Sequence, residues 1–293
     1  MGRFEDFYER NYKKLIVISY SILFLSLIVI GVHYFKTGEF FDKDISLKGG
    51  VSVTIYKEDL NVNDVKELLK QNFKDYSVRE LTDFNTNQNI GVIIEVADIQ
   101  ESQLRDVLKT KYNLNFNNKE EYDPGLTNSS FSQSFYKGLI IAIIFSFVLM
   151  SLVVFLSFKT FIPSIAVIFA ALTDILGALA VIDIIGMKLS AAGIVAFLLI
   201  IGYSIDTDIL LTTRMLKRHD HPLLERMKAS MITGMTMTIA AIAALMTGYF
   251  IAIPEELKQI FLIVSIALLF DIPSTYFGNG GILLHYCKKK NIT

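Results

Sequence analysis

Four aspartates stand inside long apolar stretches of the sequence: Asp174, Asp206, Asp208 and Asp271. A charge at the centre of a lipid bilayer costs about 2.5–3.5 kcal/mol on insertion scales, so an acid at that depth is a functional candidate. The apolar stretches contain no lysine or arginine, so the acids must be neutral, hydrated, paired with one another or paired with another subunit. Burial favours the protonated form of a carboxyl, which suits reversible proton uptake. The alternative is that each acid is a hydrogen-bonded structural residue.

The clearest local pattern around these acids is GYSIDTD, residues 202–208. At 100° per residue, Asp206 shares a helix face with Gly202, whereas Asp208 lies about 200° away on a face with Ser204. The two acids therefore cannot serve one side of a straight helix. We expect one to face a helix partner or a water path, and the other to face a polar cluster or the helix end.

Small and hydroxylated residues gather in the next apolar stretch, at Thr233, Gly234, Thr236 and Thr238. Such residues allow close packing and hydrogen bonds between membrane helices, and ordinary packing is the alternative to a functional role. The last stretch carries Asp271 two residues before a proline, which removes a helix hydrogen bond and frees carbonyls near the acid.

Several kinds of chemistry are excluded by absences. The single cysteine, Cys287, rules out a disulfide framework and a four-cysteine metal site. The sequence has no H-E-x-x-H and no G-x-x-x-x-G-K-[ST], so it predicts no metal, no cofactor and no nucleotide hydrolysis. The net charge of −1 argues against a nucleic-acid partner.

The elements that must position the acids are six apolar stretches. A bilayer core about 30 Å thick needs about 20 apolar helical residues, and buried helices of soluble proteins rarely run so long without charge. The composition agrees, with 52% hydrophobic and 19% charged residues and a mean hydropathy of +0.46. The sequence therefore predicts a polytopic α-helical membrane protein with transmembrane helices at 15–35, 138–158, 162–182, 191–211, 231–253 and 260–284.

The orientation follows from lysine and arginine in the short connections. Thirteen of them lie on one side of the predicted spans and two on the other. Positive residues favour the cytoplasmic side. This predicts a cytoplasmic N-terminus (1–14), basic loop (212–230) and C-terminus (285–293), and an extracytoplasmic segment 36–134 between helices one and two.

The outer segment reads as an α+β domain of the ferredoxin-like, β-α-β-β-α-β kind. The predicted elements, in order, are a strand Val51–Tyr56, a helix Asn61–Phe73, strands Tyr76–Leu81 and Ile90–Val96, a helix Ser102–Lys111 and a strand Leu114–Phe116. The segment has no cysteine or histidine and no nucleophile–base pair, so a binding or docking module is expected.

The chain resembles the SecF family, the smaller partners in the SecD–SecF accessory complex of protein export, which are similar to the resistance-nodulation-division transporters. The resemblance rests on the six-helix plan, on GYSIDTDILLTTR (202–214) and on SMITGMTMT (230–238). The family motif has Asn-Asp where this chain has Asp206-Thr207, and an arginine where it has Ala229. Asp206 coincides with the acid of the matching SecD helix, which makes it the first proton-relay candidate, ahead of Asp208, Asp174 and Asp271.

The resemblance implies a non-enzymatic accessory subunit in the cell membrane that assists export with the proton gradient. Its implied partners are a SecD-like subunit, a SecYEG-type translocon, translocating polypeptides and membrane lipid. One alternative is a subunit of a proton-driven exporter of small molecules or lipids from the same superfamily. Another is an intramembrane aspartyl protease, which needs two facing carboxyls, but the G-x-G-D motif of such proteases is absent.

Overall fold

A computed structural model describes residues 3–57, 60–82, 89–97, 99–112, 114–116, 118–127, 129–218 and 221–291. The chain forms two compact units. One comprises Met1–Asp42 with Ile140–Thr293, and the other comprises Lys43–Leu139. Each unit is described by itself below.

The smaller unit is an antiparallel sheet with two helices. Its elements are α2 (Ile45–Lys48), β1 (Gly50–Ile55), α3 (Val62–Asn72), β2 (Tyr76–Thr82), β3 (Asn89–Ala97), α4 (Glu101–Lys111) and β4 (Tyr122–Thr127). The strand order is β2-β3-β1-β4, and each neighbouring pair is antiparallel. This is the ferredoxin-like arrangement, so the predicted fold class of the insert is confirmed.

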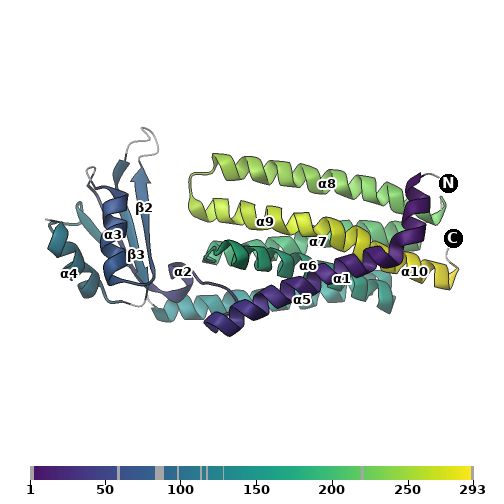
Figure 1. The fold of residues 1–293 in the computed structure, drawn as a ribbon, viewed down its shortest axis with the longest axis horizontal. Helices are drawn as coiled ribbons and strands as arrows, with labels where there is room; N and C mark the ends of the chain where they lie inside the picture. Colours follow the sequence, from purple (N-terminus) through teal and green to yellow (C-terminus); the bar gives the residue numbers. More distant parts are fainter. Residues whose placement is uncertain are drawn as a thin grey trace. The chain divides into compact units, whose positions relative to one another are not determined.

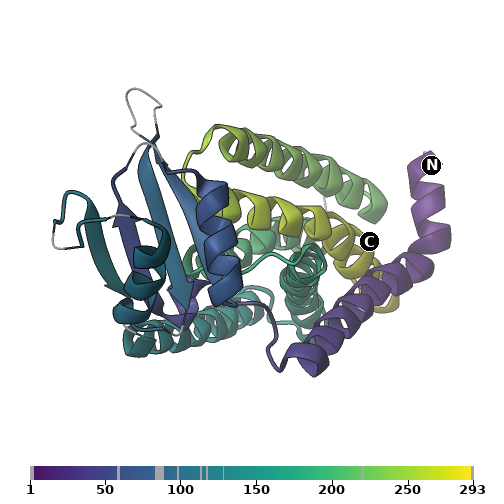
Figure 2. The same cartoon turned by 60° about the vertical axis from the view of Figure 1, so that its left-hand side comes forward.

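The core of this unit follows from the two-residue period of its strands. Alternate side chains of β1 are buried, and they pack with β3 and with the apolar stripes of α3 and α4 on one face of the sheet (Figure 2). Asn61 begins α3 by accepting a hydrogen bond from the Asn63 N–H at 2.9 Å. The helices α3 and α4 therefore cover one face of the sheet, and α2 contacts β3 outside this core.

The predicted fourth strand, Leu114–Phe116, is wrong. Leu114 is buried and Phe116 packs against the core, but the strand that completes the sheet is β4, with Tyr122 opposite Ile55. The segment YDPGLT has low strand propensity because of its aspartate, proline and glycine. Pro124 is tolerated because β4 is an edge strand, where a missing N–H breaks no second ladder.

The larger unit is helical. Its elements are α1 (Arg3–Thr37), α5 (Ser129–Phe158, which joins the two units), α6 (Phe161–Ile185), α7 (Ala191–Lys217), α8 (Leu223–Ile251), α9 (Glu255–Pro273), the π-helix η1 (Ser274–Asn279) and α10 (Gly280–Lys290). Among the described residues, six helices are long and apolar enough to cross a membrane, with Glu255–Lys290 forming the last one. The six predicted membrane helices are confirmed.

The helices extend further than the apolar stretches suggest. The predicted loop 212–230 is mostly helical, since α7 ends at Lys217 and α8 begins at Leu223. An apolar window stops at the first basic residue, whereas a helix continues because lysine and arginine stems pack against it while their charged heads reach water. The basic residues therefore stand on helix ends.

The sixth span is the centre of the bundle. α9 packs against α6, α7 and α8, and α1 runs along α6 and η1 (Figure 1). Glycines allow the close approach of α1, since a Cβ on Gly281 would lie 2.5 Å from Ile16 Cγ1. The N- and C-termini lie at the same end of this unit (Figure 1), as an even number of spans requires.

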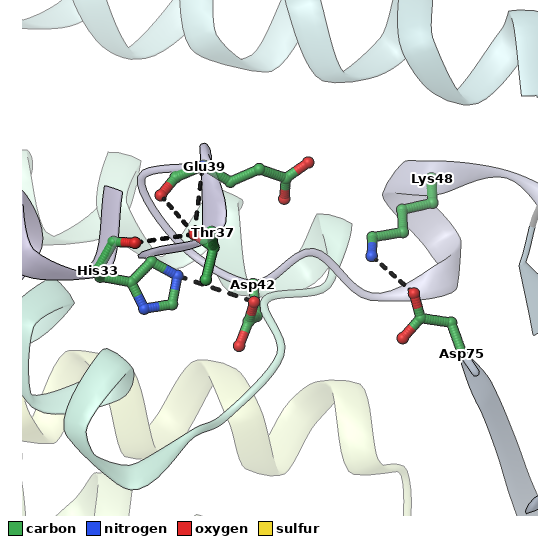
Figure 3. Close-up of polar contacts among 6 residues, drawn as sticks. All are labelled: His33, Thr37, Glu39, Asp42, Lys48 and Asp75. Atoms are coloured by element: carbon green, nitrogen blue, oxygen red, sulfur yellow. Dashed lines mark hydrogen bonds and ion pairs between the residues drawn. The ribbon is translucent and has the colours of Figure 1, made fainter. Parts of the chain in front are cut away.

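Short polar contacts order the chain where α1 ends (Figure 3). The Thr37 hydroxyl donates to the His33 carbonyl at 2.9 Å, and it accepts from the Glu39 N–H at 3.2 Å. The Asp42 carboxylate lies 3.7 Å from His33 Nε2, and the backbone carbonyl of Asp42 accepts a hydrogen bond from the Leu189 N–H at 2.7 Å.

Within the smaller unit, Lys48 Nζ lies 2.9 Å from the Asp75 carboxylate, and this ion pair connects α2 to the start of β2 (Figure 3).

Candidate functional site

Three of the four predicted acids meet in the interior of the helical unit. Asp174 of α6, Asp208 of α7 and Asp271 of α9 have relative exposures of 0%, 0% and 1%. They come from helices that pack side by side around α9. We call these three carboxyls and their hydrogen-bond partners the acid cluster.

Asp174 is held by two serine hydroxyls. The Ser204 hydroxyl of α7 lies 2.5 Å from Oδ2, and the Ser274 hydroxyl of η1 lies 2.5 Å from Oδ1. Ser274 Oγ is also 3.1 Å from the Asp271 carbonyl. Asp174 therefore links α6 to both α7 and the sixth span.

Asp271 is surrounded by threonines. The Thr207 hydroxyl lies 3.0 and 3.2 Å from its two carboxylate oxygens. Thr275 Oγ1 is 3.1 Å from Oδ1, and Thr238 Oγ1 is 3.5 Å from Oδ2. The partners come from α7, η1 and α8, so this one carboxyl contacts three other segments of the bundle.

Asp208 has a different kind of partner. Asn279 Nδ2 donates to its Oδ1 at 2.8 Å. Among the described residues, Asp208 Oδ2, Asn279 Oδ1 and the Thr212 hydroxyl are buried without a hydrogen-bond partner. Buried polar groups normally find partners, so this end of the acid cluster has unused capacity to bind a proton or a donor.

The π-helix places these partners. Pro273 has no N–H, so the Leu269 carbonyl loses its usual helical bond. The next turn widens, and the Gly280 N–H donates to the Thr275 carbonyl, five residues earlier. The extra residue in the turn leaves Ser274, Thr275 and Asn279 all buried. This irregular turn lines the acid cluster rather than the outer surface of the bundle.

Gly234 of α8 makes room for a tyrosine beside the cluster. A Cβ at this position would lie 2.0 Å from the Tyr276 hydroxyl oxygen and 3.7 Å from a methyl of Thr207. Tyr276 is 1% exposed, and its carbonyl accepts a hydrogen bond from the Tyr8 hydroxyl of α1. The glycine is therefore needed for close packing of α8 on the sixth span.

The other predicted residues do not join the acid cluster. Asp206 and Gly202 are exposed on the opposite face of α7, as the helical spacing predicts. Thr236 is exposed, and its hydroxyl donates a hydrogen bond to the Ile232 carbonyl. Thr233 accepts from Arg214 Nη1 at 3.2 Å, near the helix ends. Ser204, Gly234 and Thr238 are the supporting residues that do lie at the cluster.

Four members of the cluster were not singled out from the sequence: Thr207, Ser274, Thr275 and Asn279. Pro273 could have pointed to Ser274 and Thr275, because a proline two residues after Asp271 predicts an irregular turn beside this acid. Asn279 gave no signal, since its contact with Asp208 depends on the widened turn.

The acid cluster has the composition of a proton-holding network. Carboxyls alternate with hydroxyls and one amide, groups that can donate or accept as the carboxyls gain or lose a proton. Within the described part of the chain, no group of three or more acids, histidines or cysteines could hold a metal ion. Each of the three carboxyls is a group that can bind a proton, and each hydroxyl partner can donate or accept a hydrogen bond.

The fold defines a multi-pass membrane protein in which a ferredoxin-like domain is inserted between the first two of six spans. The family described as "Protein export membrane protein SecD/SecF, C-terminal" matches residues 107–289. The chain belongs to the SecD/SecF family of protein-export membrane proteins.

Relatives with known names agree over almost the whole chain. The protein-export membrane protein SecF of Methanocaldococcus jannaschii is 32% identical over 283 residues, which cover 94% of this chain and 96% of the relative. SecF of Methanothermobacter thermautotrophicus is 32% identical over 290 residues, with 96% and 95% covered.

Solved structures share the fold. The crystal structure of SecDF from Thermus thermophilus, described as a translocon-associated membrane protein, superimposes with a TM-score of 0.69 at 14% sequence identity. The match covers 98% of this chain and 39% of that one, so this chain spans about two fifths of the SecDF chain. A SecDF structure in a super-membrane-facing form gives a TM-score of 0.56.

Proposed function

We propose that this protein is a SecF-type accessory subunit of protein export, driven by protons that pass through the acid cluster. The observation that carries the proposal is the burial of three carboxyls from three helices, joined through hydroxyls and one amide, in the core of a SecD/SecF-family bundle. No metal or nucleotide is needed for such a cycle. The ion gradient supplies the energy.

The acid cluster couples protonation to helix packing. A carboxyl that loses its proton in a dry interior needs more donors, and one that gains a proton needs an acceptor. Each carboxyl here bridges separate helices, so each change of protonation alters contacts between helices. A proton that crosses 100 mV gains about 2.3 kcal/mol, enough to shift a conformational equilibrium of a few kcal/mol.

A second subunit of the SecD type covers the face of α7 that carries Asp206. An exposed carboxyl on a membrane helix costs about 2.5–3.5 kcal/mol if it faces lipid, so a polar partner surface is favoured. Gly202 lies on the same exposed face, and its missing side chain leaves space for a closely packed helix. Together the two subunits serve a SecYEG-type translocon.

The ferredoxin-like domain faces outward, and it acts on polypeptides that emerge from the translocon. The support is the sorting of lysine and arginine, which places both termini in the cytoplasm and the segment between α1 and α5 outside. The antiparallel sheet of this domain offers a surface for an extended client chain.

The test of the proton role is neutralisation of one carboxyl at a time. We expect Asp208→Asn, Asp174→Asn and Asp271→Asn to slow gradient-dependent export in vesicles, by up to about fifty-fold if one proton at 100 mV is lost. Asp183→Asn is the matched control, because Asp183 is near the end of α6, outside the acid cluster. Normal export by all three cluster variants would contradict the proton role.

The test of the partner face uses two glycines. A Cβ at Gly202 or at Gly31 meets nothing within 4 Å in this chain, so we expect both positions to accept a larger side chain. We expect Gly202→Leu to reduce co-purification of a SecD-like subunit, and Gly31→Leu to leave it unchanged. Purification of the wild-type chain without such a subunit, but with an exported small molecule or lipid, would favour the exporter alternative.

A further inference from the structure

A second polar feature lies where α7 ends and α8 begins, away from the acid cluster. A cavity of about 250 Å³ is lined by Arg214, Arg218, His221, Glu225, Arg226 and Ala229. We call it the arginine cavity. Three of its six lining residues carry a guanidinium group, and the proposed proton path uses none of them.

Arg226 is the residue that makes this cavity unusual. It is 3% exposed, and its Nη1 lies 3.5 and 3.3 Å from the carbonyls of Arg214 and Met215 at the end of α7. Its Nε and Nη2 have no hydrogen-bond partner among the described residues. A buried guanidinium with two unused nitrogens carries a large desolvation cost unless an anion is present.

Arg214 has the same incomplete bonding. Its Nη1 donates to the Thr233 hydroxyl, while its Nε is buried without a partner in the described part of the chain. The two arginines therefore present unfilled donors at one cavity from two helices. Such donors suit an acceptor with several oxygens.

The charge around the cavity is unbalanced. No described carboxylate forms an ion pair with any of the three arginines, and the carboxylate of Glu225 lies 3.6 Å from His221. An anion in the cavity would meet at least two positive charges for each negative one. The protein supplies a receptor for an anion rather than an internal ion pair.

The chemistry points to a phosphate group. The planar guanidinium group of arginine can donate two parallel hydrogen bonds to two oxygens of one phosphate. Ligand pockets usually have volumes of about 300–1,000 Å³. The arginine cavity is smaller, so it suits a small anion or a lipid headgroup. The cavity stands at the ends of two membrane-spanning helices, α7 and α8, which is the depth of lipid headgroups. We propose that the arginine cavity binds a phosphate group, carried by an anionic phospholipid or by free phosphate, and that this group ties α7 to α8.

Full-length protein in detergent tests the site in two arms. Native mass spectrometry would count phosphatidylglycerol and phosphatidylcholine bound to the wild-type chain, and equilibrium dialysis would measure inorganic phosphate. We expect selective retention of phosphatidylglycerol, reduced about tenfold or more in Arg214→Gln/Arg218→Gln. Lys228→Gln is the matched control, since it removes a positive charge from the same segment without lining the cavity.

Arg226→Lys provides a second variant that keeps the buried charge. Lysine cannot form the bidentate fork, so we expect weaker anion binding with a retained fold. Displacement of the lipid by inorganic phosphate would assign the site to the phosphate group alone. Lipid binding that phosphate does not displace would assign it to the phospholipid. Equal binding by wild type, the double variant and Lys228→Gln, or no binding of either probe, would overturn the proposal.

Discussion

Hydroxyl groups, rather than basic residues, surround the buried carboxyls of this protein. Among the described residues, serine and threonine hydroxyls supply the hydrogen bonds to Asp174 and Asp271, and an asparagine amide donates to Asp208. A lysine or arginine would fix a carboxyl in its charged form, whereas a hydroxyl can donate to a carboxylate or accept from a carboxylic acid. This choice of partner leaves both protonation states accessible, which a proton relay requires.

Gly234 supplies a sharp test at the scale of one residue. We expect Gly234→Ala to destabilise the protein by about 1–3 kcal/mol, because the added methyl would lie 2.0 Å from the Tyr276 hydroxyl. Gly202→Ala meets nothing within 4 Å, so it should be neutral or slightly stabilising through helix propensity. Thermal unfolding in detergent would compare the two variants. Equal melting temperatures would show that α8 does not pack on Tyr276 this tightly.

Sequence reasoning finds the acids but does not show which of them lie together. A carboxyl in an apolar stretch is conspicuous because of its cost in a membrane. The preference for Asp206 over Asp208 rested on a motif position, and the structure instead buries Asp208 and leaves Asp206 on the outer face of α7. The role of each stays a prediction. The hydroxyl partners could not be ranked, because any single threonine in a membrane helix has packing as its ordinary explanation.

At the scale of elements, the regular ones could be predicted and the irregular ones could not. Periodicity and turn signals located three of the four strands and both longer helices of the ferredoxin-like unit. β4 contains Asp123, Pro124 and Gly125, so its strand structure comes from pairing with β1 rather than from propensity. The sixth span could be predicted as a helix with an irregular turn near Pro273, but a proline does not specify that this turn is a π-turn.

The hydrogen bond from Asn279 to Asp208 supplies a test of whether Pro273 sets the π-turn. We expect a double-mutant cycle of Asn279→Ala and Asp208→Ala to give a coupling of about 1.5–3 kcal/mol in the wild-type background. In Pro273→Ala the helix regains an N–H and can close to the ordinary α-turn, which rotates later side chains by about 100°. The coupling should then fall below about 0.5 kcal/mol. Stability of each variant would be measured by thermal unfolding, and an unchanged coupling would show that the proline does not set the turn.

At the scale of the whole molecule, the helices differ in how much of their surface this chain covers. In α6, 56% of the residues of the most apolar stretch are buried, whereas the corresponding shares in α5 and α8 are 11% and 17%. The exposed described side chains of α5 are mainly large and apolar, and those of α8 are mainly apolar with several alanines, as expected for helices that face lipid or a neighbouring subunit. The acid cluster lies among the most buried spans, those that contain α6, α7 and α9.

The orientation of the chain can be tested with its single native cysteine as an internal blank. Cys287 is fully buried and should not react with a membrane-impermeant maleimide in the folded protein. Glu120, Arg10 and Lys290 are exposed, the first in the ferredoxin-like unit and the others near the two chain ends. We expect Glu120→Cys to be labelled in intact cells, and Arg10→Cys and Lys290→Cys only after permeabilisation, because the sorting of thirteen basic residues to one side predicts that this side is cytoplasmic. With six spans, Arg10→Cys and Lys290→Cys lie on the same side of the membrane and should be labelled under the same conditions. Labelling of one without the other would contradict the fold. Labelling of both in intact cells, with Glu120→Cys labelled only after permeabilisation, would contradict the orientation alone.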